Sequence, residues 1–430
     1  MSRTSTSVND GRRERAALVR LVTRASRTID PDTALDELEG LARAAGADVV
    51  LRLTQDREQA DAATLIGRGK AETLAAGVAE LDVDLVIVDN ELTPAQTRNL
   101  ERAVGCRVID RTALILDIFA GRARTREGQL QVELAQLEYL LPRLVGSSEA
   151  LSRLGGGIGT RGPGETKLET DRRRIRQRIS ALRSDIAVVQ RRRSHVRARR
   201  RRSDVPVVAL VGYTNAGKTT LFNRLTGSEA VASDALFVTL DPLMRRVKLP
   251  DARQIVLADT VGFIERLPHQ LVAAFHATLE EVAAADLLIH VVDASAPDRD
   301  RHEAAVTSVL ADVDAADVPA LTVYNKIDRI GDPEREALRL GRPGALLVSA
   351  REGFGRQPLL DAITARLAMD DAHVTLAFDR SNEADRRMLA DVYRHGRVVS
   401  HVDDDDDHVE IEAEIPRRLL ARFSRTTGTL

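Results

Sequence analysis

The segment Gly212–Thr219 (GYTNAGKT) constrains the fold more than any other part of the chain. It fits the pattern G-x-x-x-x-G-K-[ST], it directly follows the apolar run VPVVALV, and it precedes the helical run TTLFNRL. Glycines in such a strand-to-helix turn let backbone N–H groups face phosphate oxygens, and the positive end of the helix adds to the attraction. A glycine-rich turn without a ligand is the alternative. We favour a phosphate-binding loop, because both flanking elements are those that the motif requires.

The side chains of this loop divide by their chemistry. Lys218 is expected to reach the β- and γ-phosphates, and the Thr219 hydroxyl to bind Mg²⁺. The residues predicted to contact the nucleotide here are Gly212, Tyr213, Thr214, Asn215, Ala216, Gly217, Lys218, Thr219 and Thr220.

A second motif, Asp259-Thr260-Val261-Gly262, ends the apolar run QIVLAD. The Asp259 carboxylate is expected to hold Mg²⁺, and the Gly262 N–H to meet the γ-phosphate. Thr239 lies between the two motifs and is the best placed threonine to close over Mg²⁺, an assignment that depends on its position alone. Lys218, Thr239 and Gly262 are thus the residues expected to act on the reacting phosphate.

A third motif, Asn325-Lys326-Ile327-Asp328, follows the run ALTVY. An aspartate at position 328 can accept two hydrogen bonds from guanine, which adenine cannot offer, and sites of this kind reject the wrong ligand by roughly 10⁴–10⁵. Lys326 is expected to lie along the base and Asn325 to brace the phosphate loop, while Ser349 and Ala350 offer backbone N–H groups to guanine O6. A strand-capping surface turn is the alternative reading of Asn and Asp here.

The segments around these motifs predict a multidomain α/β protein. Apolar strands alternate with helices over 203–370, which predicts a P-loop GTPase domain with a mostly parallel sheet. The predicted remaining parts are a disordered tail (1–15), an N-terminal α/β domain (16–127), a helical hairpin (128–202) and a small α+β domain (371–430).

Residues 128–202 are interpreted as a hairpin because of two heptad seams. The first comprises Leu130, Leu134, Leu137, Leu141 and Leu144, and the second Leu168, Ile175, Leu182, Val189 and Val196. A glycine-rich loop joins them. Arginines dominate the second helix, with fourteen against one acid (Asp185) between Arg172 and Arg202. Such a charge run is often only a solvated face, but its imbalance favours phosphate contact.

Composition limits the other function classes. Net charge is −2, so the charge of the whole chain says little about its partners. Cys106 is the single cysteine, which excludes an intrachain disulfide. No apolar run approaches the length of a membrane span, and the polar N-terminus does not resemble a secretory signal. We expect a cytoplasmic protein. The five aspartates Asp403–Asp407 are expected to form a hairpin loop.

Several motifs together resemble the HflX family of GTPases, over roughly residues 15–420. The similar segments are GGGIGTRGPGETKLE (155–169) followed by Asp171-Arg172-Arg173, IGRGK (66–70), VIDRT (108–112), GRART (121–125) and DTVGFI (259–264). One departure is Lys167, where the family pattern predicts glutamine. The resemblance implies binding to the large ribosomal subunit, with Arg153, Arg161 and Lys167 of the glycine-rich loop reaching rRNA, and a monomer suits such a partner.

Phe263 follows D-x-x-G, where many GTPases have a glutamine that orients water. We therefore expect slow intrinsic hydrolysis and, from the resemblance, stimulation by the ribosome. In related GTPases an asparagine at the place of Asn215 binds K⁺, which predicts a potassium site; an asparagine bonding its own backbone at helix entry explains the residue equally well. Two other functions stay open: an RNA-modifying or RNA-remodelling NTPase acting off the ribosome, and a nucleotide-state regulator of a protein partner.

Overall fold

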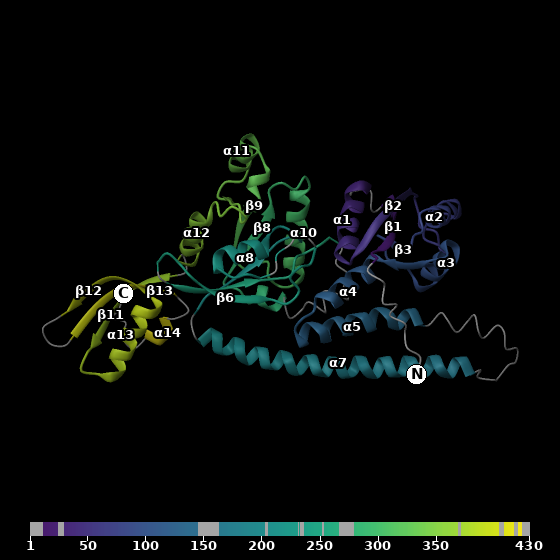
Figure 1. The fold of residues 1–430 in the computed structure, drawn as a ribbon. Helices are drawn as coiled ribbons and strands as arrows, with labels where there is room; N and C mark the ends of the chain where they lie inside the picture. Colours follow the sequence, from purple (N-terminus) through teal and green to yellow (C-terminus); the bar gives the residue numbers. More distant parts are fainter. Residues whose placement is uncertain are drawn as a thin grey trace. The chain divides into compact units, whose positions relative to one another are not determined.

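The computed structural model describes residues 12–24, 30–144, 163–202, 205–230, 232, 236–251, 253–265, 279–368, 371–403, 408–416 and 420–423. They form two compact units, each taken by itself here (Figure 1). The first unit holds the described residues up to Gln190 together with 236–241, and the second holds the rest. Within the described residues, no helix has the length and apolar character needed to cross a bilayer. The mixed α/β, multidomain fold class is as predicted.

The first unit contains a four-stranded, all-parallel sheet in the order β2-β1-β3-β4. Its strands are β1 (Glu14–Val22), β2 (Ala47–Asp56), β3 (Leu85–Val88) and β4 (Arg107–Asp110), and its helices are α1 (Pro31–Ala44), α2 (Arg68–Glu80), α3 (Pro94–Val104) and α4 (Arg111–Arg122). Crossover helices follow from the parallel order, because parallel neighbours need long connections. β1 begins inside the segment predicted as a tail, since the Arg15 N–H is held by the Asp84 carboxylate at 2.8 Å.

Buried charges join the carboxyl ends of these strands. The Asp89 carboxylate accepts from two buried arginines, Arg20 of β1 and Arg111 of α4. A buried ion of one sign is tolerated only with a close partner of the other sign, so the three side chains depend on one another. This pairing fixes β1, β3 and the start of α4 together.

Asp110 is a second junction, and it connects the sheet to the next helix, α5 (Arg126–Arg143). Its carboxylate caps α4 by accepting from Ala113 N at 2.9 Å, and it also accepts from the Tyr139 hydroxyl at 2.8 Å and from Arg143 Nη2 at 2.9 Å. The Arg143 guanidinium in turn lies 3.4 Å from the centre of the Tyr139 ring. Burial, together with the Asp110 charge, raises the pKa of Tyr139, so its hydroxyl stays a donor.

The helical hairpin consists of α5 and the forty-residue α7 (Pro163–Arg202), which run side by side in Figure 1. Leu130, Leu182 and Ile186 form its core, with Leu134 and Leu137 packed against them. Two ion pairs flank this seam: Arg178 binds Glu133 through two bonds of 2.7 Å, and Arg183 binds Glu138 at 2.8 Å. Leu130, Leu134, Leu137 and Leu182 of the predicted heptad pattern thus meet, whereas Tyr139 of α5 faces the sheet and bonds to Asp110.

A segment from beyond the phosphate loop also packs with the first unit. The buried Phe237 meets Phe119 of α4 edge-on, with ring centres 4.7 Å apart. The Asp241 carboxylate accepts from the N–H groups of Arg124 and Thr125 at 3.0 and 2.9 Å, at the start of α5. Thr239 lies between these two anchored residues.

The second unit is built on a six-stranded sheet in the order β10-β9-β8-β5-β7-β6. The strands are β5 (Val207–Val211), β6 (Leu243–Lys248), β7 (Gln254–Asp259), β8 (Leu287–Asp293), β9 (Ala320–Asn325) and β10 (Leu346–Leu347), and only β6 is antiparallel to its neighbour. The helices are α8 (Lys218–Thr226), α10 (Arg299–Asp312), η3 (Ile327–Arg329), α11 (Asp332–Gly341) and α12 (Arg356–Ala368). Apolar residues of α8 and α12 share one core with β5 and β8.

A three-stranded antiparallel sheet follows in the same unit. It contains β11 (Asp371–Asp379), β13 (His408–Pro416) and β12 (Arg397–Asp403) in that order, with α13 (Glu383–His395) and α14 (Leu420–Phe423). Arg253 connects it to the larger sheet by binding Asp371 at 3.0 Å. Of the predicted aspartate loop, residues 404–407 lie outside the described residues, between the paired strands β12 and β13.

Candidate nucleotide site

The motif Gly212–Thr219 forms the turn between β5 and α8, at the carboxyl edge of the sheet. Gly212 has φ +151°, and a Cβ there would lie 2.2 Å from the Val291 carbonyl oxygen. Gly217 has φ +90°, and its Cβ would lie 2.2 Å from Asn325 Nδ2. Glycine is therefore required at both positions for conformation and for space. The turn holds all of the predicted loop residues, including Thr220 in the first turn of α8.

Lys218 lies folded over this turn. Its ammonium group donates to the carbonyl oxygens of Gly212 and Tyr213 at 3.0 and 2.8 Å, and only 6% of the residue is exposed. Burial lowers the pKa of Lys218 to about 8, an effect that the nearby Asp259 charge opposes and that Lys326 reinforces. Burial disfavours the charged form of Lys218, and the negative charge of a phosphate beside this ammonium would stabilise that form.

Thr214 adds a polar group to the same turn. Its hydroxyl is buried and has no hydrogen-bond partner in the described part of the chain. Buried hydroxyls usually have a partner, and those that lack one in the protein often point to a ligand or an ion. This observation fits a loop that is completed by a bound molecule.

Thr219 and Asp259 bring two oxygen ligands together. Asp259 ends β7 and is fully buried, and its Oδ2 accepts a hydrogen bond of 2.7 Å from the Thr219 hydroxyl. Thr260 anchors this end of the strand by donating to the Leu210 carbonyl at 2.6 Å. A carboxylate beside a hydroxyl is a donor set that suits Mg²⁺. Thr239, the third predicted ligand, lies in the segment that packs with the first unit, so its role stays a prediction.

The backbone after Asp259 follows the phosphate loop closely. Phe263 N donates to the Gly212 carbonyl at 3.1 Å, and Thr214 N donates to the Phe263 carbonyl at 2.7 Å. A Cβ on Gly262 would lie 2.8 Å from Thr214 Cα and 3.0 Å from Lys218 Nζ. The glycine thus allows the two backbones to approach, and it leaves the space beside the Lys218 ammonium free of a side chain. The Phe263 ring is buried, with 2% of the residue exposed.

Asn325 joins three parts of the site. Its Nδ2 donates to the Ala216 carbonyl at 2.9 Å, and its Oδ1 accepts from Ala350 N at 2.9 Å. The next residue, Lys326, has φ +64°, which directs its ammonium toward Asp293 at 2.8 Å and Asn215 Oδ1 at 3.4 Å. The phosphate loop and the third motif are therefore held as one piece.

Asp328, the residue predicted to recognise the base, is oriented by Ser349, which follows β10. The Ser349 hydroxyl donates to Asp328 Oδ1 at 2.6 Å. Ser349 N donates to the Phe354 carbonyl at 3.1 Å, and Ala350 N donates to Asn325. Both N–H groups thus have partners inside the protein, and their contact with guanine O6 stays a prediction. Ser349 also contributes its hydroxyl, which fixes the Asp328 carboxylate.

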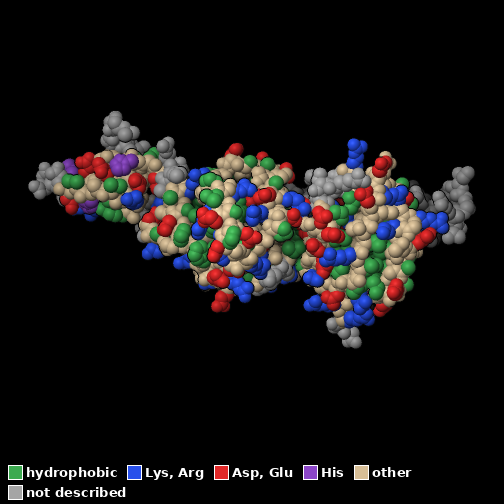
Figure 2. Space-filling model, turned by 90° about the horizontal axis from the view of Figure 1, so that it is seen from above, with side chains coloured by type: hydrophobic (Ala, Val, Ile, Leu, Met, Phe, Trp, Pro, Cys, Tyr) green, Lys and Arg blue, Asp and Glu red, His purple; other side chains and the backbone are tan. Residues whose placement is uncertain are grey.

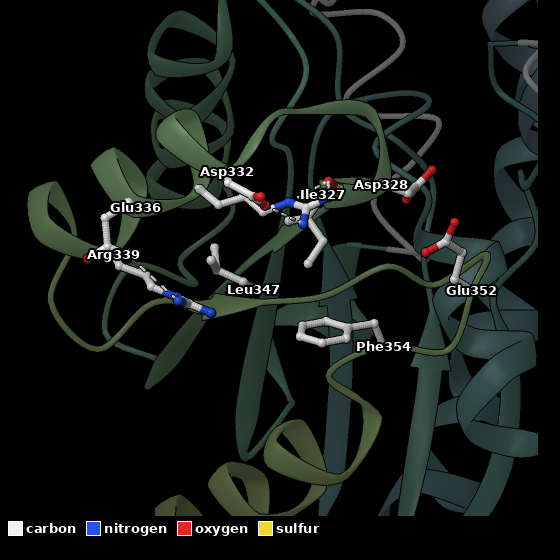
Figure 3. Close-up of a pocket in the computed structure, with 9 residues that line it drawn as sticks. Ile327, Asp328, Asp332, Glu336, Arg339, Leu347, Glu352 and Phe354 are labelled. Carbon is white, nitrogen blue, oxygen red and sulfur yellow. Dashed lines mark hydrogen bonds and ion pairs between the residues drawn. The ribbon is translucent and has the colours of Figure 1, made fainter.

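A pocket of about 360 Å³ borders this loop (Figure 3). The side chains of Ile327, Leu347 and Phe354 face it, and the carboxylates of Asp328 and Glu352 lie on the same side of it. Two arginines of α11 complete the lining, each paired with an acid of the same helix: Arg335 with Asp332 and Arg339 with Glu336. The predicted base-recognition residue Asp328 therefore lines a pocket that α11 borders on its other side.

Sequence reasoning missed three groups of this site. The Asp293 carboxylate at the end of β8 could have been found, because β8 lies next to β5 and ends at the same edge of the sheet. The Ser349 hydroxyl and the Tyr213 side chain carried no signal, since their contacts depend on loops that meet only in the fold.

Family models match three consecutive parts of the chain. A model described as "GTP-binding GTPase N-terminal" matches residues 32–120, one described as "GTP-binding GTPase Middle Region" matches 122–200, and one described as "50S ribosome-binding GTPase" matches 207–326. GTPase HflX of Caldanaerobacter subterraneus is 47% identical over 411 residues, which cover 96% of this chain and 93% of that protein.

The chain belongs to the HflX family of GTPases.

GTPase HflX of Escherichia coli is also similar, with 46% identity over 384 residues, or 89% of each chain. Among solved structures, the complex of SsGBP with GDP is 25% identical with a TM-score of 0.47, and the match covers 82% of this chain and 98% of that one. This HflX-family chain is a GTPase, and its three nucleotide motifs lie along one edge of the second sheet.

The assignment of Asp328 leads to a test of base specificity. Asp328→Asn is expected to raise the Kd for GTP about a hundredfold, because a carboxylate that accepts two bonds from guanine is replaced by an amide. The same change should improve binding of xanthosine triphosphate, whose base offers the complementary group.

Equilibrium titration with fluorescent nucleotides measures both effects. Asp332→Asn is the matched control, because this acid lines the same pocket and is exposed. Unchanged GTP affinity in Asp328→Asn would contradict the assignment.

Proposed function

We propose that this HflX-family GTPase binds GTP and GDP with Mg²⁺ and acts on the large ribosomal subunit, where hydrolysis is coupled to the splitting or rescue of ribosomes. The observation that carries the proposal is the match of residues 207–326, the segment that contains the nucleotide loop, to a family described as 50S ribosome-binding. Thr219 and Asp259 are the residues that hold Mg²⁺, which supplies charge stabilisation to the phosphates.

The arginines of α7 support a nucleic-acid partner. Arg178 and Arg183 pair with acids of α5 and serve the hairpin itself, but Arg173, Arg176 and Arg192 are exposed. On the face shown in Figure 2, basic and acidic side chains are interspersed, so the concentration of one sign on α7 differs from that face. Arginine clusters of this kind bind phosphates, with an affinity that falls steeply with salt.

The glycine-rich loop is the proposed contact with rRNA. Arg153 and Arg161 lie outside the described residues, and Lys167 belongs to α7, with nothing described of its side chain. In sequence, the loop joins two helices whose seam is closed by Leu130, Leu182 and Ile186. A stiff support of this kind suits a loop that enters a crowded polyanion.

Binding to isolated large subunits tests this proposal. Reversal of three charges, Arg153→Glu with Arg161→Glu and Lys167→Glu, is expected to weaken co-sedimentation and to reduce the slope of log affinity against log salt by about three, one per lost phosphate contact. Intrinsic GTP hydrolysis should not change.

The matched control reverses three exposed arginines of the last sheet region, Arg380, Arg387 and Arg397. Equal binding of the loop variant and the wild type would overturn the rRNA assignment. Activation by naked RNA without subunit binding would favour an RNA-remodelling NTPase, and the absence of both would favour a regulator of a protein partner.

A potassium site at Asn215 is the second part of the proposal. Asn215 has φ +58°, and its Oδ1 accepts a long bond of 3.4 Å from Lys326, a partner that a cation could replace. A monovalent cation there would stabilise charge that develops between the phosphates.

Hydrolysis is therefore expected to be faster in K⁺ than in Na⁺, by about tenfold or more, at equal ionic strength. Asn215→Ala should remove the difference and retain the rate measured in Na⁺. Equal wild-type rates in the two salts would exclude the potassium site.

A further inference from the structure

The side chain of Tyr213 makes contacts that phosphate binding does not require. Its ring stacks on His302, in the first turn of α10, with ring centres 3.8 Å apart and an interplanar angle of 12°. Its hydroxyl accepts a hydrogen bond of 3.1 Å from Glu265 N. Only 7% of Tyr213 is exposed, so a residue of the phosphate loop is fixed to a helix and to the segment after the second motif.

Glu265 is held at its side chain as well. Its carboxylate binds Arg301 of α10 at 2.8 Å, and Arg301 also lies 3.6 Å from Asp298. The Tyr213 cluster, formed by Tyr213, His302, Glu265 and Arg301, therefore connects α10 to the backbone that follows Gly262. Phe263, which makes the two backbone hydrogen bonds to the phosphate loop, precedes Glu265 of this cluster by two residues.

This arrangement bears on how the chain hydrolyses GTP. Phe263 offers no polar side chain, and its ring is buried, so it cannot orient water as a glutamine does. The groups that remain near Lys218 include the backbone of Gly262, where a Cβ would lie 3.0 Å from Lys218 Nζ. Backbone donors stabilise a transition state only if they are already placed before the reaction, because a displacement of about 1 Å is costly in rate.

We propose that Tyr213 is a positioning residue for GTP hydrolysis. With His302, it holds residues 262–265 against the phosphate loop, so that the Gly262 N–H is placed to face the γ-phosphate. The tyrosine acts through this segment and does not touch the reacting atoms. A backbone N–H group held in position thereby assists hydrolysis in this chain, whereas a glutamine side chain assists it in other GTPases.

Removal of the hydroxyl alone tests this role. Tyr213→Phe keeps the ring and its stack but loses the bond to Glu265 N, so kcat for intrinsic hydrolysis is expected to fall about fivefold. The Kd for a non-hydrolysable GTP analogue should change less than twofold, because the phosphate contacts come from the loop backbone and Lys218. His302→Ala should lower kcat in the same direction, whereas His302→Phe, which keeps a stacking ring, should restore it.

Tyr393→Phe is the matched control, because it removes an exposed hydroxyl in α13 and should leave both constants unchanged. A purely structural role for Tyr213 would lower affinity and thermal stability along with kcat, and that result would overturn the proposal. An unchanged kcat in Tyr213→Phe would overturn it too. An increased kcat would do the same, because the Tyr213 cluster would then restrain hydrolysis.

Discussion

The close approach of four backbone segments at the carboxyl edge of the second sheet is the constraint on which the rest of the site depends. Gly212 packs against the end of β8, Gly217 against Asn325, and Gly262 against Thr214, each at a distance that a Cβ would violate. Since β5 lies between β7 and β8, the residues that end these strands meet around one loop. Sheet order, more than any single motif, thus places Asp259 and Asn325 beside the same phosphate loop.

The electrostatics of the site follow from that packing. Lys218 is buried against carbonyl oxygens, and the pKa of its ammonium falls accordingly. Its oppositely charged neighbour, Asp259, is bound to Thr219, and Asp293 is bound to Lys326. Lys218, the cation that is expected to meet phosphate, and Lys326, the one expected to lie along the base, are both held in place by the protein, so little reorganisation is needed when nucleotide binds.

Much of this arrangement could be predicted from the sequence, because it depends on local patterns. The apolar run QIVLAD forms β7, and the run ALTVY forms most of β9. Thr93 caps α3 in a complete capping box with Gln96, three residues further on. Apolar runs that end in Asp or Asn are typical of strands that carry ligands at their carboxyl ends.

The features that could not be predicted depend on partners far along the chain. Arg20 occurs in an apolar run, and only the fold reveals that Asp89 neutralises it. The antiparallel edge strand β6 has the sequence LMRRVK, in which apolar and basic residues do not alternate regularly. This pattern therefore does not indicate a strand. Tyr213 meets His302 only because α10 starts at the same edge of the sheet, and packing of that kind leaves no pattern in either segment.

We propose that this GTPase, which has Phe263 where many others have a water-orienting glutamine, depends on the large ribosomal subunit for fast hydrolysis. Single-turnover GTP hydrolysis with and without purified large subunits, at low and high salt, tests this dependence. We expect slow hydrolysis by the GTPase alone, strong stimulation by the subunit, and loss of that stimulation at high salt. An equal rate with and without subunits at low salt would contradict this dependence.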